Sequence, residues 1–288
     1  MTENSKNSRL FGCHVSVAGG LSNAFKRAVD IGCDTIQIFS KNQKQWKPKP
    51  FDPDEVAKYH EEKKRTSIAP VVIHDSYLIN LCASNPVNLK KSRESFADEV
   101  ERADILKAEY LNFHPGAHQG KGEDWGIKKI AESLNIITEK SSGSMVTLLL
   151  EATAGQGTSI GYRFEHLRRI IDLSEKKDRM AVCIDTAHIF AAGYDISTEE
   201  AYEAVMLELN DVIGLDNVMV FHINDSKTEL GSRVDRHENL GKGRIGLRAF
   251  EFFVNDERHA GKPMILETPG GEKFFKKNLK ILRNMIKK

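Results

Sequence analysis

Short apolar runs alternate with longer, more polar segments along the whole chain. Each run is too short and too uniformly apolar to be a strand with one solvent-exposed face. The runs therefore predict strands that are covered on both faces, as in a parallel sheet. Eight such runs are present: LFGCHVS (10–16), CDTIQIFS (33–40), PVVIHDSYL (70–78), YLNFHPG (110–116), MVTLLLEATAG (145–155), MAVCIDTAH (180–188), VMVFHIND (218–225) and PMILETPG (263–270).

The segments between the runs carry apolar residues at helical spacing. Two apolar faces show this most clearly: Leu89, Phe96, Val100 and Ala103, and then Ile127, Ile130, Leu134 and Ile137. Eight alternating strand and helix units require right-handed crossovers and a parallel sheet. Closure into a single (β/α)8 TIM barrel is the economical arrangement, because it removes both sheet edges. An open doubly wound sheet is the alternative, although no G-x-G-x-x-G follows the first run.

The length of 288 residues suits one barrel domain, which we assign to residues 9–288, after a polar and flexible leader at 1–8. This start lacks the apolar core of a signal peptide and no run could span a membrane, so we expect a cytoplasmic protein with no membrane partner.

The four cysteines form no C-x-x-C pair and are interpreted as buried free thiols. The net charge of +1 means that any phosphate binding must come from local patches.

Most of the predicted strands end in a histidine or a carboxylate. These residues are His74, His114, Glu151, Asp185, His222 and Glu267. A single histidine at a strand end is more often structural than a ligand, but the carboxyl ends of all barrel strands meet at one face, so these side chains would surround one bowl. We add His188, three residues after Asp185, and the Asp235-x-His237 triplet, because extended backbone points both of its side chains the same way.

The candidate set combines five histidines with four carboxylates and no thiolate. Such ligands suit zinc, manganese or iron(II); we favour zinc, with Mn2+ at part of the site as an alternative. Nine ligands are too many for one ion and suit two or three ions with open coordination positions. Adjacent cations of this kind suit phosphodiester hydrolysis, because one activates water and a neighbour stabilises the charge on phosphate and leaving oxygen. No G-x-S-x-G, Walker A or catalytic Cys-His signature points to another chemistry.

Long motifs in this sequence resemble those of the endonuclease IV family, the metal-dependent apurinic/apyrimidinic (AP) endonucleases of base excision repair. The resemblance spans most of the chain and is specific because many motifs occur in the family's order. They are HVSVAGGL, FSKNQKQW, HDSYLINL, NFHPGAH, E-x-TAGQG, CIDTAHIFAAGYD, H-x-ND-x-K, GSRVDRHENLGKGRIG and ILETPG.

The resemblance implies a cluster of three metal ions, typically Zn2+, at the C-terminal face of the barrel. One ion would be held by His74, His114 and Glu151, a second by Glu151, Asp185, His222 and Glu267, and a third by His188, Asp235 and His237. Glu151 would then be the catalytic residue that bridges two ions and the attacking hydroxide. The family is a hydrolase that cuts the phosphodiester 5′ to an abasic site in duplex DNA and leaves a 3′-hydroxyl and a 5′-deoxyribose phosphate. The resemblance also implies repair of blocked 3′ ends. A TIM barrel that contacts DNA with its own loops needs no partner subunit, so we expect a monomer, which is associated with the nucleoid when it acts on DNA.

Family members flip the abasic nucleotide and fill the gap with loop side chains, which match Lys44, Tyr77 and Leu78 here. Lysine is a poorer planar wedge than arginine, which other members carry at the position of Lys44. Phosphate contacts are expected from further basic residues: Lys41, Lys47, Lys49, Lys227, Arg233, Arg236, Lys242 and Arg244. Ala152 stands where we expect asparagine, which removes a hydrogen bond behind the bridging glutamate but no ligand.

Two other functions compete with this interpretation. A sugar isomerase or epimerase on a metal-binding TIM barrel would need one or two ions, which leaves the Asp235-x-His237 triplet and the KNQKQW and SYL loops without a purpose. A DNA-binding protein without catalysis would have no use for a complete ligand set. The sequence alone does not separate abasic cleavage from 3′-end trimming, nucleotide incision or exonuclease activity.

Overall fold

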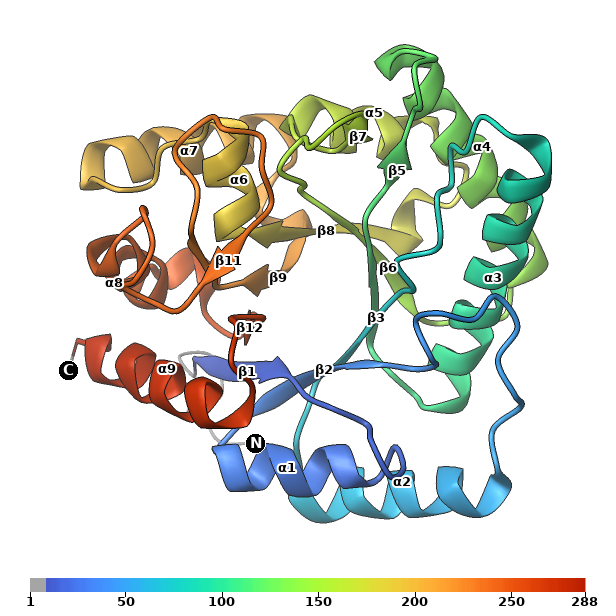
Figure 1. Cartoon of the computed structure of the whole chain (residues 1–288), viewed down its shortest axis with the longest axis horizontal. Helices are drawn as coiled ribbons and strands as arrows, with labels where there is room; N and C mark the ends of the chain where they lie inside the picture. The colour runs from blue at the N-terminus through green and yellow to red at the C-terminus, as the bar shows by residue number, and fades with distance from the viewer. Residues whose placement is uncertain (1–8, 288) are drawn as a thin grey trace.

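Eight parallel strands close into a barrel at the centre of the molecule, as the computed structural model in Figure 1 shows. The structure describes residues 9–287, so the predicted leader at 1–8 lies outside the described residues. Around the barrel the strand order is β1-β12-β9-β8-β6-β4-β3-β2. The strands are β1 (Leu10–His14), β2 (Thr35–Phe39), β3 (Val71–His74), β4 (Tyr110–Phe113), β6 (Thr147–Glu151), β8 (Met180–Asp185), β9 (Val218–His222) and β12 (Pro263–Leu266). The predicted (β/α)8 barrel is therefore confirmed.

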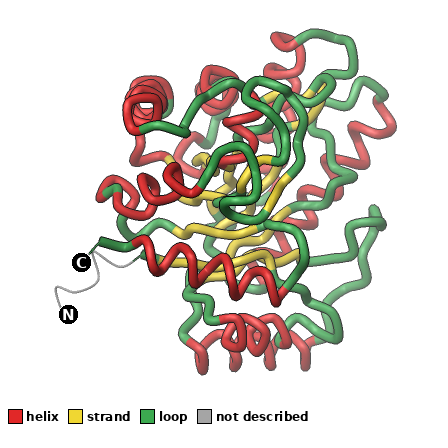
Figure 2. Tube along the Cα trace, turned by 60° about the vertical axis from the view of Figure 1, so that its left-hand side comes forward, coloured by secondary structure: helices red, strands yellow, loops and turns green. Residues whose placement is uncertain are grey.

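Helices surround the barrel on its outer side, as Figures 1 and 2 show. They are α1 (Asn23–Ile31), α2 (Pro53–Thr66), α3 (Pro86–Ile105), α4 (Glu123–Lys140), α5 (Phe164–Leu173), α6 (Thr186–Ala192), α7 (Glu199–Val212), α8 (Leu247–Asn255) and α9 (Glu272–Met285). The apolar faces predicted for α3 and α4 are those that pack inward, with Phe96 and Ile130 fully buried. No helix within residues 9–287 is both long enough and apolar enough to cross a bilayer.

Two layers of apolar side chains fill the molecule. A large cluster lies between the sheet and the helices, and a small second cluster consists of Val72, Leu149, Ala181, Cys183, Val220 and Ile265. The side chains of a strand alternate between its two faces, so the second cluster is the plug inside the barrel. Candidate ligands lie two residues after several of its members, for example His74 after Val72 and Glu151 after Leu149. The candidate ligands of these strands therefore rest on an apolar floor at the barrel mouth.

Several features differ from the sequence-based expectation. The strands are shorter than the predicted runs, because the residues around each strand-end ligand leave the sheet to form the mouth of the barrel. Helix α6 was not predicted; it begins directly after Asp185, whose carboxylate accepts hydrogen bonds from the backbone N–H groups of Ala187 and His188. Two small antiparallel pairs, β5 (Gly116–Ala117) with β7 (Ser159–Ile160) and β10 (Asp225–Ser226) with β11 (His237–Glu238), also lie outside the prediction.

Candidate metal centre

The carboxylate of Glu151 lies at the centre of the strand-end residues and is completely buried. Its Oε2 atom is 3.4 Å from His74 Nε2 and 3.5 Å from His114 Nε2. Its Oε1 atom is 3.3 Å from His222 Nδ1 and 3.1 Å from His188 Nδ1. The two oxygens of one carboxylate thus face two different groups of histidines.

Two groups of potential ligand atoms share Glu151. The first consists of His74, His114 and Glu151, and the second adds Asp185, His222 and Glu267 to Glu151, with the ligand atoms of each group within 4.8 Å of one another. These are the first two groups that the family resemblance implies. The structure therefore brings these strand-end side chains together in the predicted bowl.

A third group combines helix α6 with the long loop after β9. Asp185, His188 and His237 place their ligand atoms within 4.8 Å of one another. Asp235 lies beside them, with Oδ2 3.2 Å from His188 Nε2 and Oδ1 3.4 Å from His237 Nε2. Asp185 thus belongs to two groups, which the sequence analysis did not anticipate. The third group depends on residues that are far apart in the chain.

The loop that carries Asp235 and His237 is held by one buried carboxylate. Asp225 accepts hydrogen bonds from the backbone N–H groups of Gly241, Gly243 and Ile245, at 2.9 to 3.0 Å. A carboxylate that accepts several backbone N–H bonds fixes the conformation of the segment that donates them. The predicted motif GSRVDRHENLGKGRIG therefore folds back on the end of β9 instead of extending freely over the surface.

The electrostatics of the bowl favour positive charge. Burial disfavours a charged Glu151, but His222 and His114 outweigh that effect and hold its pKa well below the ordinary value. Burial acts in the same way on Glu267, where His222 and His14 hold the pKa well below its ordinary value. Both carboxylates are therefore charged at neutral pH, and the neighbouring histidines supply the compensating positive charge. Divalent metal ions fit this donor set.

Cys183 lies close to Glu151 and His222 and could in principle add a sulfur ligand. Burial in the barrel plug raises the pKa of its thiol to about 12. A neutral thiol is a poor ligand, since metals bind the thiolate. Without a bound ion this thiol is therefore protonated, and the other donors are imidazole and carboxylate, a type that suits zinc or manganese.

Comparison with known proteins places the chain in a family. Residues 25–285 match the family model described as "Xylose isomerase-like TIM barrel". The "Probable endonuclease 4" of Chloroflexus aggregans is 49% identical over 279 residues, which cover 96% of this chain and 98% of that protein. The corresponding protein of Protochlamydia amoebophila is 46% identical, with 95% of this chain and 97% of that protein covered. The chain belongs to the endonuclease IV family.

Solved structures agree with this assignment. Endonuclease IV from Thermus thermophilus has a TM-score of 0.86 and 35% sequence identity, with 96% of this chain and 98% of that chain covered. A D-tagatose 3-epimerase-like protein has a TM-score of 0.74 but only 18% identity, so the likeness extends to the fold alone. The resemblance to the endonuclease IV family, stated from sequence motifs, is thereby confirmed.

Several polar side chains beside the ligands escaped the sequence analysis. The amide of Asn112 donates a hydrogen bond to Glu151 Oε2, and that of Asn224 donates one to Asp185 Oδ2 at 2.7 Å. Gln37 contacts two further ligands. One feature of the sequence could have identified each of these residues. Each is an uncharged polar residue within or directly after an otherwise apolar run. Side-chain amides in such positions can orient the candidate ligands that they contact.

Ala152 is compatible with the ligand arrangement. Its side chain is buried, and its backbone carbonyl accepts a hydrogen bond from His188 Nδ1 at 3.0 Å. This bond leaves His188 Nε2 facing Asp235 and His237. The backbone thus supplies a contact that orients a ligand at this position.

The two loops predicted to probe DNA lie side by side. Ser76 Oγ donates to the backbone oxygen of Gln43 at 3.1 Å, and the backbone N–H of Tyr77 donates to the side-chain oxygen of Gln43 at 3.2 Å. The side chain of Tyr77 is 71% exposed although it is aromatic, and Lys44 is exposed beside it. An exposed aromatic ring at the mouth of the bowl is available for stacking.

Lys41 contradicts the prediction that it contacts DNA phosphate. Its side chain is fully buried, and Nζ lies 2.9 Å from Asp98 and 3.4 Å from Glu99, both on α3. Nζ also donates to the backbone oxygen of Ser95 at 3.0 Å. Lys41 therefore anchors the base of the KNQKQW loop to α3. The amino-acid composition of a loop does not show which of its basic residues are buried and which are exposed.

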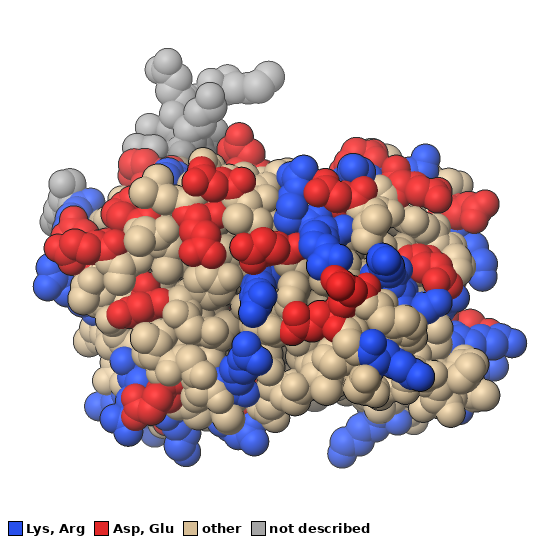
Figure 3. Space-filling model, turned by 90° about the horizontal axis from the view of Figure 1, so that it is seen from above, with Lys and Arg blue, Asp and Glu red and all other residues tan. Residues whose placement is uncertain are grey.

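The other predicted phosphate contacts are exposed. They are Lys47 and Lys49 in the first loop and Lys227, Arg233, Arg236, Lys242 and Arg244 in the loop after β9. Arg244 forms an exposed ion pair with Glu229 at 3.1 Å, and Arg233 packs over the ring of Tyr162. On the side of the molecule seen in Figure 3, basic and acidic residues are interspersed. No single-sign field covers that side.

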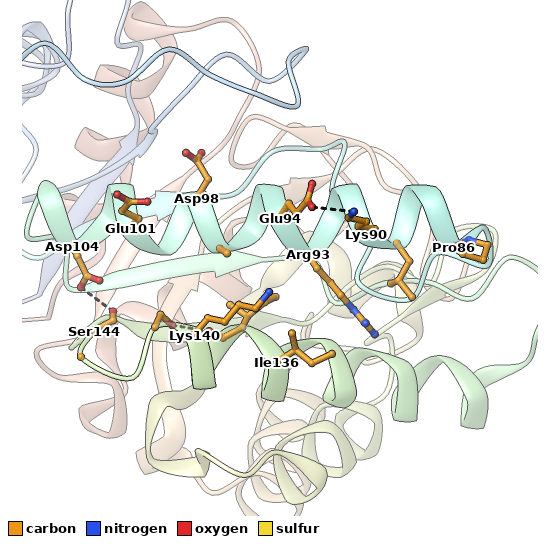
Figure 4. Close-up of a pocket in the computed structure, with 15 residues that line it drawn as sticks. Pro86, Lys90, Arg93, Glu94, Asp98, Glu101, Asp104, Ile136, Lys140 and Ser144 are labelled. Carbon is orange, nitrogen blue, oxygen red and sulfur yellow. Dashed lines mark hydrogen bonds and ion pairs between the residues drawn. The ribbon is translucent and has the colours of Figure 1, made fainter.

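A groove of about 920 Å³ on the outer surface lies between α3 and α4 (Figure 4). Its walls include Glu94, Asp98 and Glu101 of α3, with Leu89 and Ile136 contributing apolar surface. Lys90, Arg93 and Lys140 line the groove as well, so it carries charges of both signs, and no candidate metal ligand lines it. This groove is therefore separate from the face that carries the ligands.

Proposed function

We propose that this protein is a metal-dependent AP endonuclease of base excision repair. It hydrolyses the phosphodiester 5′ to an abasic site in duplex DNA, with a 3′-hydroxyl and a 5′-deoxyribose phosphate as products, and it also repairs blocked 3′ ends. The observation that carries the proposal is the position of Glu151, whose two oxygens face two separate ligand groups. A carboxylate in this position suits a bridge between two ions, which single-ion chemistry does not require.

The ligand groups would hold three Zn2+ ions, with Mn2+ as an alternative at part of the site. When bound, the ions supply an activated water and neutralise the charge that develops on the phosphate. His74 and His114 would serve one side of Glu151, and His222 with Glu267 the other. Asn112, which bonds to Glu151 Oε2, holds the carboxylate in its central orientation.

Binding of damaged DNA would use both loops at the barrel mouth. Lys44, Tyr77 and Leu78 lie on loops tied together by Gln43, which suits insertion of side chains into the gap left by a flipped nucleotide. Exposed lysines and arginines of the loop after β9 would contact phosphates. The barrel carries ligands and loops on one chain, so we propose a monomer that acts in the cytoplasm on nucleoid DNA.

The decisive experiment uses a duplex with one tetrahydrofuran abasic site, which cannot undergo β-elimination. The expected result is a cut immediately 5′ to the site that leaves a 3′ end which a polymerase extends. An undamaged duplex is the control. Absence of cleavage by protein with a verified metal complement would refute the proposal, and sugar epimerisation would then be the next activity to assay.

A further inference from the structure

Gln37 is a buried amide on the inner face of β2, directly beside two candidate metal ligands. Its Oε1 atom is 2.8 Å from His222 Nε2, and its Nε2 atom is 2.5 Å from Glu267 Oε1. Nε2 also lies 2.9 Å from His14 Nδ1. The side chain has no exposed surface, so water does not compete for these bonds. One amide therefore connects both ligands to a third residue, His14.

The chemistry of Glu267 fixes which way the amide points. Its charged carboxylate can only accept hydrogen bonds, so the group of Gln37 that faces it must be the NH2. A flipped amide would place its oxygen against the carboxylate. The oxygen of Gln37 therefore faces His222.

This orientation determines the proton position on His222. The oxygen of Gln37 can only accept, so His222 Nε2 must carry a proton and donate it. Nδ1 is then the nitrogen that a metal ion would bind in place of a proton. It is also the nitrogen that faces the other ligands, 3.3 Å from Glu151 Oε1 and 3.3 Å from Glu267 Oε2.

We propose that Gln37 is a positioning residue that makes Nδ1 of His222, and Oε2 of Glu267, the ligand atoms of the second group. Gln37 keeps His222 in one tautomer and occupies the other oxygen of Glu267. The inference rests on the proposed function only in assuming that the group binds metal. It concerns one group of ligands, because within residues 9–287 no hydrogen bond joins the Gln37 side chain to His74 or His114.

The first experiment needs no variant. Nitrogen chemical shifts of His222 in the zinc-loaded protein should show metal at Nδ1 and a proton at Nε2, with that proton slow to exchange. Metal at Nε2 with the proton at Nδ1 would overturn the assignment. The measurement uses zinc alone, so the result is independent of whether the protein cleaves abasic DNA.

The second experiment compares Gln37→Leu and Gln37→Met with the wild type in zinc competition against a chelator. Loss of a partner that orients a ligand lowers metal affinity by about 10- to 100-fold. We expect this loss for one ion only and faster exchange of the His222 Nε2 proton. Thr35→Val is the matched control, since Thr35 occupies the previous inward position on β2 and its hydroxyl bonds to the Pro70 carbonyl.

Two outcomes would contradict the proposal. In the first, zinc affinity equals that of the wild type in both Gln37 variants. In the second, the Gln37 variants lose affinity equally for every ion, and Thr35→Val shows the same loss. The second outcome would indicate general loosening of β2. If the abasic duplex is not cut but one ion is weakened selectively, the proposed function fails while the role of Gln37 stands.

Discussion

A single carboxylate that faces two groups of histidines should control catalysis far more than DNA binding. We expect Glu151→Gln to lower the single-turnover rate of abasic cleavage by at least about 1000-fold, since metal-supplied charge stabilisation is worth several kcal/mol. The affinity for abasic duplex, measured by fluorescence anisotropy, should change little. Glu238→Gln is the control, because Glu238 adjoins the candidate ligand His237 but its carboxylate accepts hydrogen bonds from Asn239. Cleavage by Glu151→Gln at the wild-type rate would eliminate the bridging role.

Two lysines three residues apart should behave in opposite ways. Lys44→Ala should weaken DNA binding and reduce the slope of log K against log [salt] by about 1, as expected for one lost phosphate contact. Lys41→Met should leave that slope unchanged and lower the free energy of unfolding by roughly 3 kcal/mol, because it leaves Glu99 buried without its cation. Salt titrations and denaturant unfolding measure the two effects. A reduced salt slope in Lys41→Met would restore its assignment as a DNA contact.

At the scale of elements, the loop after β9 should respond to changes in its anchor. A Cβ atom on Gly243 would overlap the backbone oxygen of Ser226 and a side-chain oxygen of Asp225. Gly243→Ala should therefore shift the loop, displace Asp235 and His237, and weaken one zinc ion by about tenfold or more. Chelator competition measures this loss. Gly143→Ala is the control, since nothing lies near its Cβ position, and equal zinc affinity in both variants would contradict the expectation.

The packing of α7 against the short helix η4 (Glu257–His259) should make stability depend on pH. Burial lowers the pKa of His259 to about 4, below the value of about 6.5 in an unfolded chain. As the pH falls, the unfolded chain therefore binds this proton first, so the stabilising contribution present above pH 6.5 is lost on the way to pH 4. Between pH 7 and pH 5 this histidine should account for about 2 kcal/mol of lost stability.

The same packing provides the variant that tests this pH dependence. Tyr202 donates its hydroxyl proton to Asp256 at 2.7 Å, so His259 Nε2, 2.9 Å away, donates to the Tyr202 oxygen. In His259→Gln an amide can make a similar bond without titrating. The difference in unfolding free energy between wild type and variant, measured with denaturant, should be about 2 kcal/mol smaller at pH 5 than at pH 7. A difference independent of pH would show that His259 does not titrate in this range.

The periodicity of apolar residues along the chain predicted most of the fold. What the sequence analysis missed depends on contacts between residues that are far apart in the sequence. Apolar runs that end in His74 or Glu151 predict both a strand and the side of the barrel where the ligand lies. Lys41 was assigned wrongly because its partners on α3 are more than fifty residues away in the sequence. Gln37 was overlooked because its role depends on which strands become neighbours. The local pattern therefore indicates the candidate ligands, whereas the residues that contact them from other strands become visible only in the closed barrel.

For the whole molecule, metal removal should lower stability as well as activity. Glu151, Asp185 and Glu267 bring carboxylates together in a bowl from which water is largely excluded, and without cations they repel one another. At a zinc concentration about 100 times Kd, binding contributes about 2.7 kcal/mol, or a shift in Tm of about 5–10 °C. Thermal unfolding before and after chelation, with zinc added back, measures this shift. An unchanged Tm in protein whose metal loss is verified would argue against this cluster as the binding site.

The origin of the candidate ligands has a consequence for how the enzyme can change over evolutionary time. The strands, the residues that directly follow them and α6 supply every candidate ligand except Asp235 and His237, which both come from the loop that Asp225 holds. Insertion or exchange of that one contiguous segment adds or removes these two ligands without altering any strand of the barrel. The part of the third candidate group that this segment supplies is thus a separable unit, and a barrel of this kind could acquire or lose it in a single genetic event.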